Sequence, residues 1–306
     1  MGIRVAVIGT GYLGRHHARV FSELEETELV GVVDIDEGRA GEIAAQYRCQ
    51  AFVDYRDVLP YVDALSIVTP TTTHHEIAMS SLQAGKDLLV EKPFTRTVEE
   101  AEGLIGEAES SGRIIQVGHL ERFNPAVLYI EDKLEAPRFL EAERLSPFPG
   151  RGTDVDITLD LMIHDIDIIL SLCRSAIIDI RAVGAKVLTD KLDVAKAWLE
   201  MEDGSKALIT ASRLSPEKKR ILKVFQASEY IMLDYRTLEI FRHSKDSTGI
   251  IQREEIKLEY REPLKEELRD FAGCIMNRRQ PMVTARDGLE ALRVALEISR
   301  KIEETI

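Results

Sequence analysis

Hydrophobic positions in the first 120 residues form short continuous runs, and the stretches between these runs have helical periodicity. The runs predict strands at 3–8, 29–33, 64–68, 87–90 and 114–117. The stretches between them predict helices that begin near Leu13, Gly38, His74 and Val98, with Asp36 and Thr97 as N-caps. Strands that alternate with helices form parallel sheets covered on both faces, so this part predicts a doubly wound parallel sheet.

The pattern changes from Arg138 onward. A helix is predicted at about 158–173, and two more close the chain near 264–277 and 284–304. Between them, alternating apolar and polar positions predict strands at 178–188, 195–201, 206–212, 221–227, 230–234, 238–242 and 250–258. Alternation over successive strands with turn signals indicates a large, mostly antiparallel sheet with one solvated face. A chain of 306 residues exceeds one ordinary core, so we predict an α/β domain at 1–122 and an α+β domain at 123–306.

A glycine-rich turn directly follows the first predicted strand. It reads Gly9-Thr10-Gly11-Tyr12-Leu13-Gly14, the G-x-G-x-x-G pattern. In this setting the first glycine permits a tight turn, the second lets the backbone approach a pyrophosphate, and the third lets helix and strand pack closely. Asp34 ends the next strand, twenty positions after Gly14, where an acidic residue holds the adenosine ribose of a dinucleotide. Because its carboxylate would repel a 2′-phosphate, the sequence favours NAD over NADP, although Arg39 lies nearby.

Composition and charge narrow the classes of partner. The formal net charge is −13, which disfavours binding to nucleic acid or to an anionic membrane. No apolar run reaches the length of a membrane span. The three cysteines have no C-x-x-C spacing and no H-x-x-x-H pair accompanies them, so we expect reduced thiols, a cytoplasmic protein and no metal site.

Two further clusters follow predicted strands of the first domain. The segment from Thr69 and Pro70 to His74 is rich in hydroxyl groups and is suited either to hydrogen-bonding a cofactor or to capping the next helix. Glu91 and Lys92 directly follow a buried strand. A lysine at such a position can have a lowered pKa and exchange protons near neutral pH, whereas the alternative is a structural Glu91–Lys92 pair.

The predicted helix at 159–171 carries a narrow polar stripe. At 3.6 residues per turn, its members are Asp160, His164, Asp167 and Ser171. Asp160 and His164 are four residues apart, a spacing at which a carboxylate can orient an imidazole for acid–base chemistry. The alternative interpretation is a stripe that faces water.

These motifs together resemble the glucose–fructose oxidoreductase, inositol dehydrogenase and MocA family over essentially the whole chain. The resemblance rests on the glycine loop, Thr69-Pro70 with His74, Glu91-Lys92-Pro93, Arg122-Phe123-Asn124-Pro125, and Asp160 with His164 and Asp167. Met162 departs from it, because the family often has glycine there. The segments 118–125 and 159–165 are similar to a narrower group, the UDP-N-acetylglucosamine 3-dehydrogenases.

The resemblance implies an NAD(P)-dependent oxidoreductase that moves a hydride between a sugar-ring secondary alcohol and nicotinamide. The catalytic residues would be Lys92, Asp160 and His164, and the substrate-binding residues would be Lys92, Arg122, Asn124, Asp160 and His164. The cofactor residues would be Gly9, Thr10, Gly11, Tyr12, Leu13, Gly14, Asp34, Thr69, Pro70, His74, Glu91 and Lys92. Either Lys92 or His164 could take the proton.

Alternative substrates are a free sugar, a cyclitol or a dihydrodiol. Alternative functions are a non-catalytic NAD and sugar sensor, or a hydrolase or epimerase that recycles NAD. A nucleotide sugar would need local cations for its diphosphate, and the arginines considered for this are Arg122, Arg144, Arg151 and Arg213. The resemblance further implies a homodimer or homotetramer built on the second domain's sheet.

Overall fold

The computed structural model describes residues 2–148 and 155–306, and the chain divides into two compact units. The first unit holds the residues up to Leu120 together with Glu262–Leu289, and the second holds the described residues of Glu121–Arg261 and Glu290–Ile306. The boundary expected after residue 122 lies beside this division. The segment Glu262–Leu289 was expected in the second domain, and it packs within the first unit.

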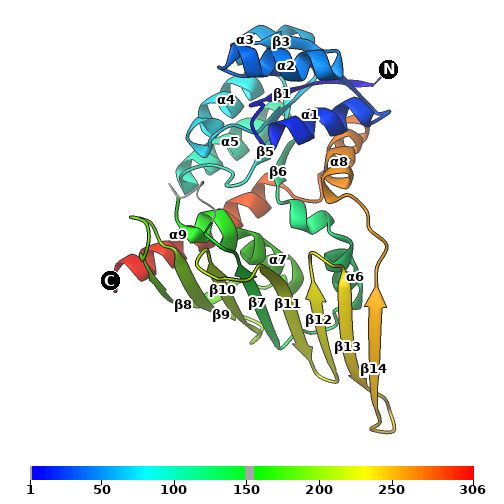
Figure 1. Cartoon of the computed structure of the whole chain (residues 1–306), viewed down its shortest axis with the longest axis vertical. Coiled ribbons are helices and arrows are strands. Elements are labelled where there is room, and N and C mark those ends of the chain that lie inside the picture. Colours follow the sequence, from blue (N-terminus) through cyan, green and yellow to red (C-terminus); the bar gives the residue numbers. More distant parts are fainter. Residues whose placement is uncertain (1, 149–154) are drawn as a thin grey trace. The chain divides into compact units, whose positions relative to one another are not determined.

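A six-stranded parallel sheet, which includes β1, β3, β5 and β6 of Figure 1, forms the centre of the first unit. Its strand order is β3-β2-β1-β4-β5-β6. Its strands are β1 (Ile3–Ile8), β2 (Thr27–Val33), β3 (Gln50–Phe52), β4 (Ala64–Ile67), β5 (Asp87–Glu91) and β6 (Ile115–Gly118). The accompanying helices are α1 (Gly14–Glu23), α2 (Glu37–Tyr47), α3 (Tyr55–Val58), η1 (Leu59–Tyr61), α4 (Thr71–Gln83), α5 (Val98–Ser111) and α8 (Pro263–Asn277). The predicted doubly wound sheet is confirmed, whereas the short elements β3 and α3 were not predicted.

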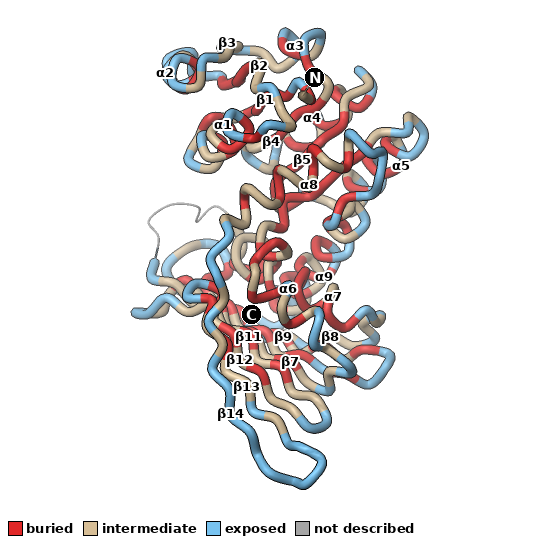
Figure 2. The backbone as a smooth tube through the Cα atoms, turned by 90° about the vertical axis from the view of Figure 1, so that its right-hand side faces the viewer, coloured by how far each residue is buried: buried red, intermediate tan, exposed pale blue. Residues whose placement is uncertain are grey.

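The expected helix starts are present with their caps. Asp36 accepts a hydrogen bond from the Arg39 backbone N–H at 3.0 Å, and Thr97 accepts one from Glu100 at 3.2 Å. The Glu100 carboxylate turns to the Arg96 N–H instead of completing a capping box at Thr97. Central strands are buried over nearly their whole length (Figure 2), which explains why their sequences are continuous apolar runs.

An eight-stranded sheet forms the second unit, in the order β14-β13-β12-β11-β7-β10-β9-β8. Its strands are β7 (Phe139–Leu145), β8 (Ile177–Ala185), β9 (Val194–Met201), β10 (Lys206–Ser212), β11 (Lys219–Gln226), β12 (Glu229–Asp234), β13 (Glu239–Lys245) and β14 (Ile251–Lys257). All neighbours are antiparallel except β7 and β10, so the predicted mostly antiparallel sheet is confirmed. The central strand β7 was not predicted, because Arg144 interrupts its apolar alternation.

Helices cover one face of this sheet. They are η2 (Leu120–Phe123), α6 (Pro125–Lys133), the π-helical turn η3 (Thr158–Met162), α7 (Ile163–Cys173) and α9 (Ala285–Glu303), with α9 contributing from Glu290 onward. Their apolar side chains share one core with alternate residues of the strands, including Leu140, Ala142, Leu222 and Val224. Residues of intermediate exposure occupy the other face, among them Phe139, Trp198, Phe225 and Tyr230, whose rings contact one another in series. None of the described helices has the length and apolar character of a membrane span.

Candidate active site

A cavity of about 710 Å³ opens at the carboxyl ends of β1, β2 and β4. Its lining includes five residues predicted to hold a cofactor: Gly9, Gly11, Asp34, Thr69 and Pro70. Residues that the sequence did not single out complete it, including Ile35, Val53, Tyr55 and Ile77. The cavity has the size of a small-molecule site and lies at the edge of an open parallel sheet where ligands bind.

The glycines of the loop have distinct structural reasons. Gly9 has a φ of +92°, and a Cβ there would lie 2.6 Å from the Val68 carbonyl oxygen. A Cβ at Gly14 would lie 1.8 Å from the Gly9 carbonyl oxygen, so only glycine lets α1 begin this close to the loop. A Cβ at Gly11 would meet no atom within 4 Å, because this residue borders the cavity. The open space at Gly11 and the start of α1 suit a pyrophosphate.

Asp34 lines this cavity, and hydrogen bonds fix its carboxylate. Its carboxylate accepts hydrogen bonds from the Thr10 backbone N–H and hydroxyl, both at 2.8 Å, and from the Asp36 N–H at 3.0 Å. Burial alone would raise the pKa of Asp34, but the hydrogen bonds from Asp36 and Thr10 outweigh it and lower the pKa. Arg39 also reaches the carboxylate at 3.4 Å. Asp34 is therefore a fixed anion suited to ribose hydroxyls, and Thr10 acts by orienting it.

The remaining predicted cofactor residues lie outside this lining. Tyr12 is exposed with its ring against His16, Leu13 is the N-cap of α1, and Lys92 is half-buried after β5. His74 is buried, and its ring nitrogens lie 2.9 Å from the Thr69 carbonyl and 3.0 Å from the Pro93 carbonyl. His74 thus joins the loop after β4 to the loop after β5 instead of facing the cavity.

Glu91 is buried at the end of β5, and its carboxylate has partners on α1 and on the backbone. Its carboxylate lies 3.3 Å from the buried His17 ring, and a Cβ added to Gly118 would lie 2.6 Å from it. The backbone N–H of Lys92 donates to it at 3.3 Å. Glu91 therefore supports the backbone that carries Lys92, a role that sequence analysis missed.

Glu267 of α8 is a second buried carboxyl of the first unit that sequence analysis missed. Both of its oxygens lack a hydrogen-bond partner among the described residues. Burial raises its pKa well above the usual range, and repulsion from Glu91 and Asp270 adds to the increase. Its position could have been recognised, because it follows Leu264 by three residues and precedes Phe271 by four on the apolar face of α8.

The acid–base candidates of the second unit lie at the start of its buried helix. Asp160 lies in the π-helical turn and His164 in the first turn of α7, both half-buried. The predicted stripe assumed a regular α-helix, and the π-helical turn changes the angular spacing at Asp160. Asp167 is buried, and Arg122 reaches it at 3.4 Å. The predicted helix is confirmed, while the joint role of these side chains stays a prediction.

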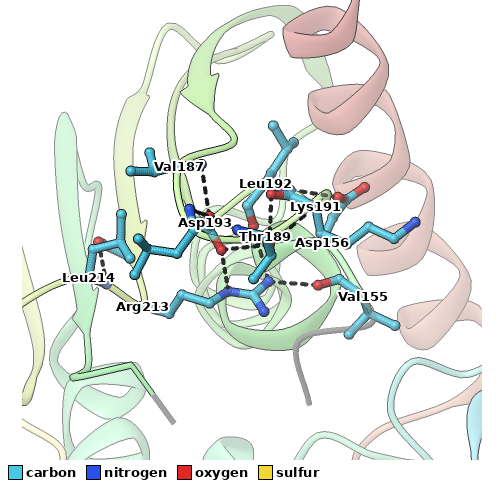
Figure 3. Close-up of polar contacts among 11 residues, drawn as sticks. Val155, Asp156, Val187, Thr189, Lys191, Leu192, Asp193, Arg213 and Leu214 are labelled. Atoms are coloured by element: carbon cyan, nitrogen blue, oxygen red, sulfur yellow. Dashed lines mark hydrogen bonds and ion pairs between the residues drawn. The ribbon is translucent and has the colours of Figure 1, made fainter. Parts of the chain in front are cut away.

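A buried cluster fixes the segment that leads into this helix (Figure 3). Arg213 donates to the carbonyls of Val155 at 2.6 Å and Leu192 at 3.0 Å. Asp193 accepts hydrogen bonds from the backbone of residues 187–189. Asp156 accepts from the Leu192 N–H, and its own carbonyl accepts from the Asp160 N–H. The cluster therefore holds the turn that carries Asp160.

Three sequence expectations about substrate-binding side chains need correction. Arg144 is buried between Asp165 and Glu121, at 2.7 and 3.1 Å. Burial alone would lower its pKa, but the charges of Asp165 and Glu121 outweigh burial and raise the pKa. Arg213 is buried and binds backbone carbonyls, so neither arginine is open to a diphosphate. The buried Asn124 caps α6 with its side-chain oxygen. Its side-chain amide group donates to Glu121 and to the Tyr235 carbonyl, so these donors are already used within the unit. Arg151 lies outside the described residues.

Comparison with known proteins identifies the class. The model of the oxidoreductase family with an NAD-binding Rossmann fold, which unites glucose–fructose oxidoreductase, inositol dehydrogenase and MocA, matches residues 3–119. The chain is 40% identical to the UDP-N-acetylglucosamine 3-dehydrogenase of Acidithiobacillus ferrooxidans, over 98% of this chain and 97% of the relative. The chain belongs to this family. It is an oxidoreductase, and its cofactor is NAD.

Other relatives extend the comparison. A solved structure of the Acidithiobacillus ferrooxidans enzyme superposes with a TM-score of 0.95 at 38% identity, covering 99% of this chain and 98% of that one. The scyllo-inositol 2-dehydrogenase of Bacillus subtilis is 29% identical over 96% of this chain and 92% of its own length. A scyllo-inositol dehydrogenase structure from Lactobacillus casei has a TM-score of 0.85 at 20% identity, with coverage of 99% and 98%, and shows the shared fold.

Proposed function

We propose that this protein is an NAD-dependent dehydrogenase of a nucleotide sugar and that it oxidises UDP-N-acetylglucosamine at the C3 hydroxyl. The observation that carries the proposal is the 40% identity to an enzyme of that activity, which extends over 98% of the chain and so includes both units. A cyclitol is the competing substrate class, because the inositol dehydrogenase from Bacillus subtilis is 29% identical over a similar length.

The residues of the first unit fit the cofactor. The cavity beside Gly11 leaves room for the pyrophosphate, and the start of α1 offers backbone N–H groups to it. Asp34, fixed by Thr10, would accept hydrogen bonds from the adenosine ribose hydroxyls and would repel a 2′-phosphate. Bound NAD supplies the hydride acceptor.

The proposed proton chemistry belongs to Lys92, Asp160 and His164. Lys92 or His164 takes the proton of the substrate hydroxyl as the hydride leaves the same carbon, so that one alcohol yields one ketone, one hydride and one proton. Asp160 would orient His164 and stabilise its charged form. Glu91, buried against His17, would keep the Lys92 backbone in place. Arg122, which reaches Asp167, is the remaining predicted substrate contact.

We further propose that the protein is cytoplasmic and forms a homodimer or homotetramer. The support for assembly is the second unit's open sheet face, where the rings of four large aromatic residues contact one another in series although helices cover only the opposite face. Native mass measurement of the purified chain tests the assembly, and a monomer at micromolar concentration would contradict it.

The activity test offers the purified protein NAD with UDP-N-acetylglucosamine, N-acetylglucosamine or scyllo-inositol, and follows the absorbance of the reduced nicotinamide. We expect turnover of the nucleotide sugar and a product lacking two hydrogens. Preference for scyllo-inositol would refute the proposed substrate. Binding of NAD without turnover of any sugar would favour a sensor, and product without net reduced nicotinamide would favour NAD recycling.

Variants then test the proton chemistry. Lys92→Ala and His164→Ala should each lower kcat by about a hundredfold or more while the affinity for reduced nicotinamide is kept. Lys257→Ala is the matched control, because this exposed lysine on β14 pairs only weakly with Glu239, at 3.7 Å. Turnover near the wild-type rate in both site variants would remove the assignment.

A further inference from the structure

One end of the helix-covered face of the second unit's sheet is strongly cationic. Along β7 the side chains of Leu140 and Ala142 enter the core, and the next residue in that row is Arg144. The neighbouring strand β11 begins the equivalent row with Arg220, and Arg144 and Arg220 are register partners. Two guanidinium groups directly opposite each other on one face of a sheet repel and destabilise it. This end of the face therefore needs negative charge.

Two described carboxylates of the second unit, Asp165 and Glu121, supply the negative charge for these two arginines. Arg144 takes Asp165 and one Glu121 oxygen, and Arg220 reaches the same Glu121 oxygen at 3.4 Å. Two carboxylates thus balance two guanidinium groups. Arg144 is buried, whereas the Arg220 side chain is 36% exposed and can still reach a ligand.

Two more cations lie beside Arg220 and have no carboxylate of their own. Arg236 donates to the Lys218 backbone carbonyl at 2.8 Å, which brings Arg236 and Lys218 together. Neither is ion-paired with any carboxylate in the part of the chain that the structure describes. The nearby Glu217 pairs with Lys219, and the nearby Asp234 accepts from backbone N–H groups of Arg236 and Thr237.

The cations of this cluster lie close enough to repel one another. Repulsion from Arg220, followed by burial and by Arg236, lowers the pKa of Lys218. Burial and then Arg144 lower the pKa of Arg220. An excess of positive charge is unexpected by chance in a chain whose net charge is −13. An anion bound between these side chains would relieve the repulsion.

The cluster lies at the same end of the second unit as its acid–base candidates. Arg144 connects it to Asp165 of α7, the residue that follows His164. The backbone of Arg220 accepts a hydrogen bond from Tyr235, which connects β11 to the β12 end that precedes Arg236 (Figure 1). A substrate whose sugar reaches His164 could therefore extend its charged part along this end of the sheet.

We propose that Lys218, Arg220 and Arg236 form an anion site that takes the diphosphate of a nucleotide-sugar substrate. This inference rests on the proposed function, and it assigns to these three side chains the recognition of the nucleotide part of the substrate. Guanidinium forks suit phosphate oxygens because they donate two parallel hydrogen bonds, and the lysine adds a point charge. This site supplies the positive charge for a diphosphate that the sequence analysis looked for in Arg144 and Arg213, both of which are buried.

The experiment compares Lys218→Gln and Arg236→Gln with the wild-type protein. Arg220 is left intact, because its loss would leave Glu121 with less compensating charge. The matched control is Lys223→Gln, a cation of the same strand that lies on the other face and pairs with Glu141 and Glu143. Calorimetric titration with UDP and with inorganic pyrophosphate measures the anion site, and the KM for UDP-N-acetylglucosamine and for N-acetylglucosamine 1-phosphate measures its use in turnover.

We expect each variant to weaken UDP binding and to raise the KM for the nucleotide sugar about tenfold or more, with kcat and the KM for NAD little changed. Lys218→Arg keeps the positive charge and should keep the wild-type UDP affinity and the wild-type KM for the nucleotide sugar. Lys223→Gln should change neither the UDP affinity nor this KM. Unchanged UDP affinity in both variants would overturn the inference while leaving the proposed function intact. A wild-type protein that binds UDP through these cations but turns over only free cyclitols would support the anion site and refute the proposed function. A larger effect on the monophosphate than on the nucleotide sugar would refute the assignment to a diphosphate.

Discussion

The glycine loop allows a matched pair of substitutions that separates cofactor binding from folding. Gly11→Ala places a methyl group where no protein atom lies within 4 Å, so the folded chain can accept it without rearrangement. Gly14→Ala places the same group 1.8 Å from the Gly9 carbonyl oxygen, far inside any permitted contact. Both residues belong to one motif, yet the structure predicts opposite phenotypes for them.

The magnitudes follow from these distances. In Gly11→Ala the free energy of unfolding should stay within about 0.5 kcal/mol of the wild type, because the added methyl group meets no protein atom within 4 Å. The methyl group enters the space of the pyrophosphate, and the loss of one or two charge-assisted hydrogen bonds costs about 1.5–3 kcal/mol each. The Kd for NAD should therefore rise at least tenfold. Gly14→Ala should instead destabilise the apoprotein by about 1–3 kcal/mol, because the loop and α1 must separate.

The assay is thermal unfolding with and without NAD, since a ligand that binds only the folded state raises Tm according to its concentration relative to Kd. For Gly11→Ala we expect the wild-type Tm without NAD and a clearly smaller increase of Tm with NAD. For Gly14→Ala we expect a lowered Tm without NAD. A Gly11→Ala protein that binds NAD with wild-type affinity would refute the placement of the pyrophosphate at this residue. Wild-type stability of Gly14→Ala would refute the stated reason for glycine there.

Three further predictions concern single side chains. Asp34→Ser should shift the ratio of kcat/KM for NAD over NADP toward NADP about tenfold or more, because the fixed carboxylate is removed; an unchanged ratio would contradict its role. Burial raises the pKa of Glu267 in the folded protein, so as pH rises the unfolded chain releases this proton before the folded chain does. The free energy of unfolding therefore falls as pH rises from the unfolded-state pKa, about 4.3, toward the higher folded-state pKa. Glu267→Gln does not titrate, and its stability advantage over the wild type, measured by urea unfolding, should be larger at pH 8 than at pH 5; a constant difference would refute this. Arg213→Met should cost about 3–5 kcal/mol, because it removes a buried cation beside Asp193 and two hydrogen bonds to carbonyls, and a loss below about 1 kcal/mol would contradict its anchoring role.

The sequence by itself determined the fold class and pointed to several residues that line the cavity of the first unit. Buried parallel strands must be continuous apolar runs, and the glycine loop is a local structure whose φ angles and close approaches depend on neighbouring residues. Gly9, Gly11 and Asp34 were therefore picked out from spacing alone, and all three line the cavity, while their role toward the cofactor stays a prediction. The short edge strand β3 was missed because three residues carry too little pattern. The central strand β7 was missed because Arg144 stands in its covered, otherwise apolar row.

Only the tertiary structure decided which charged side chains are free to act. Arg144 and Arg213 have the same side chain as any surface arginine, but long-range packing buries them against Asp165 and against backbone carbonyls. Glu91 and Lys92 are adjacent in sequence, yet the pleat of the strand directs the carboxylate to His17, a partner on α1. Such pairings join residues far apart along the chain, and their energies depend on burial and distance, which local sequence patterns do not encode.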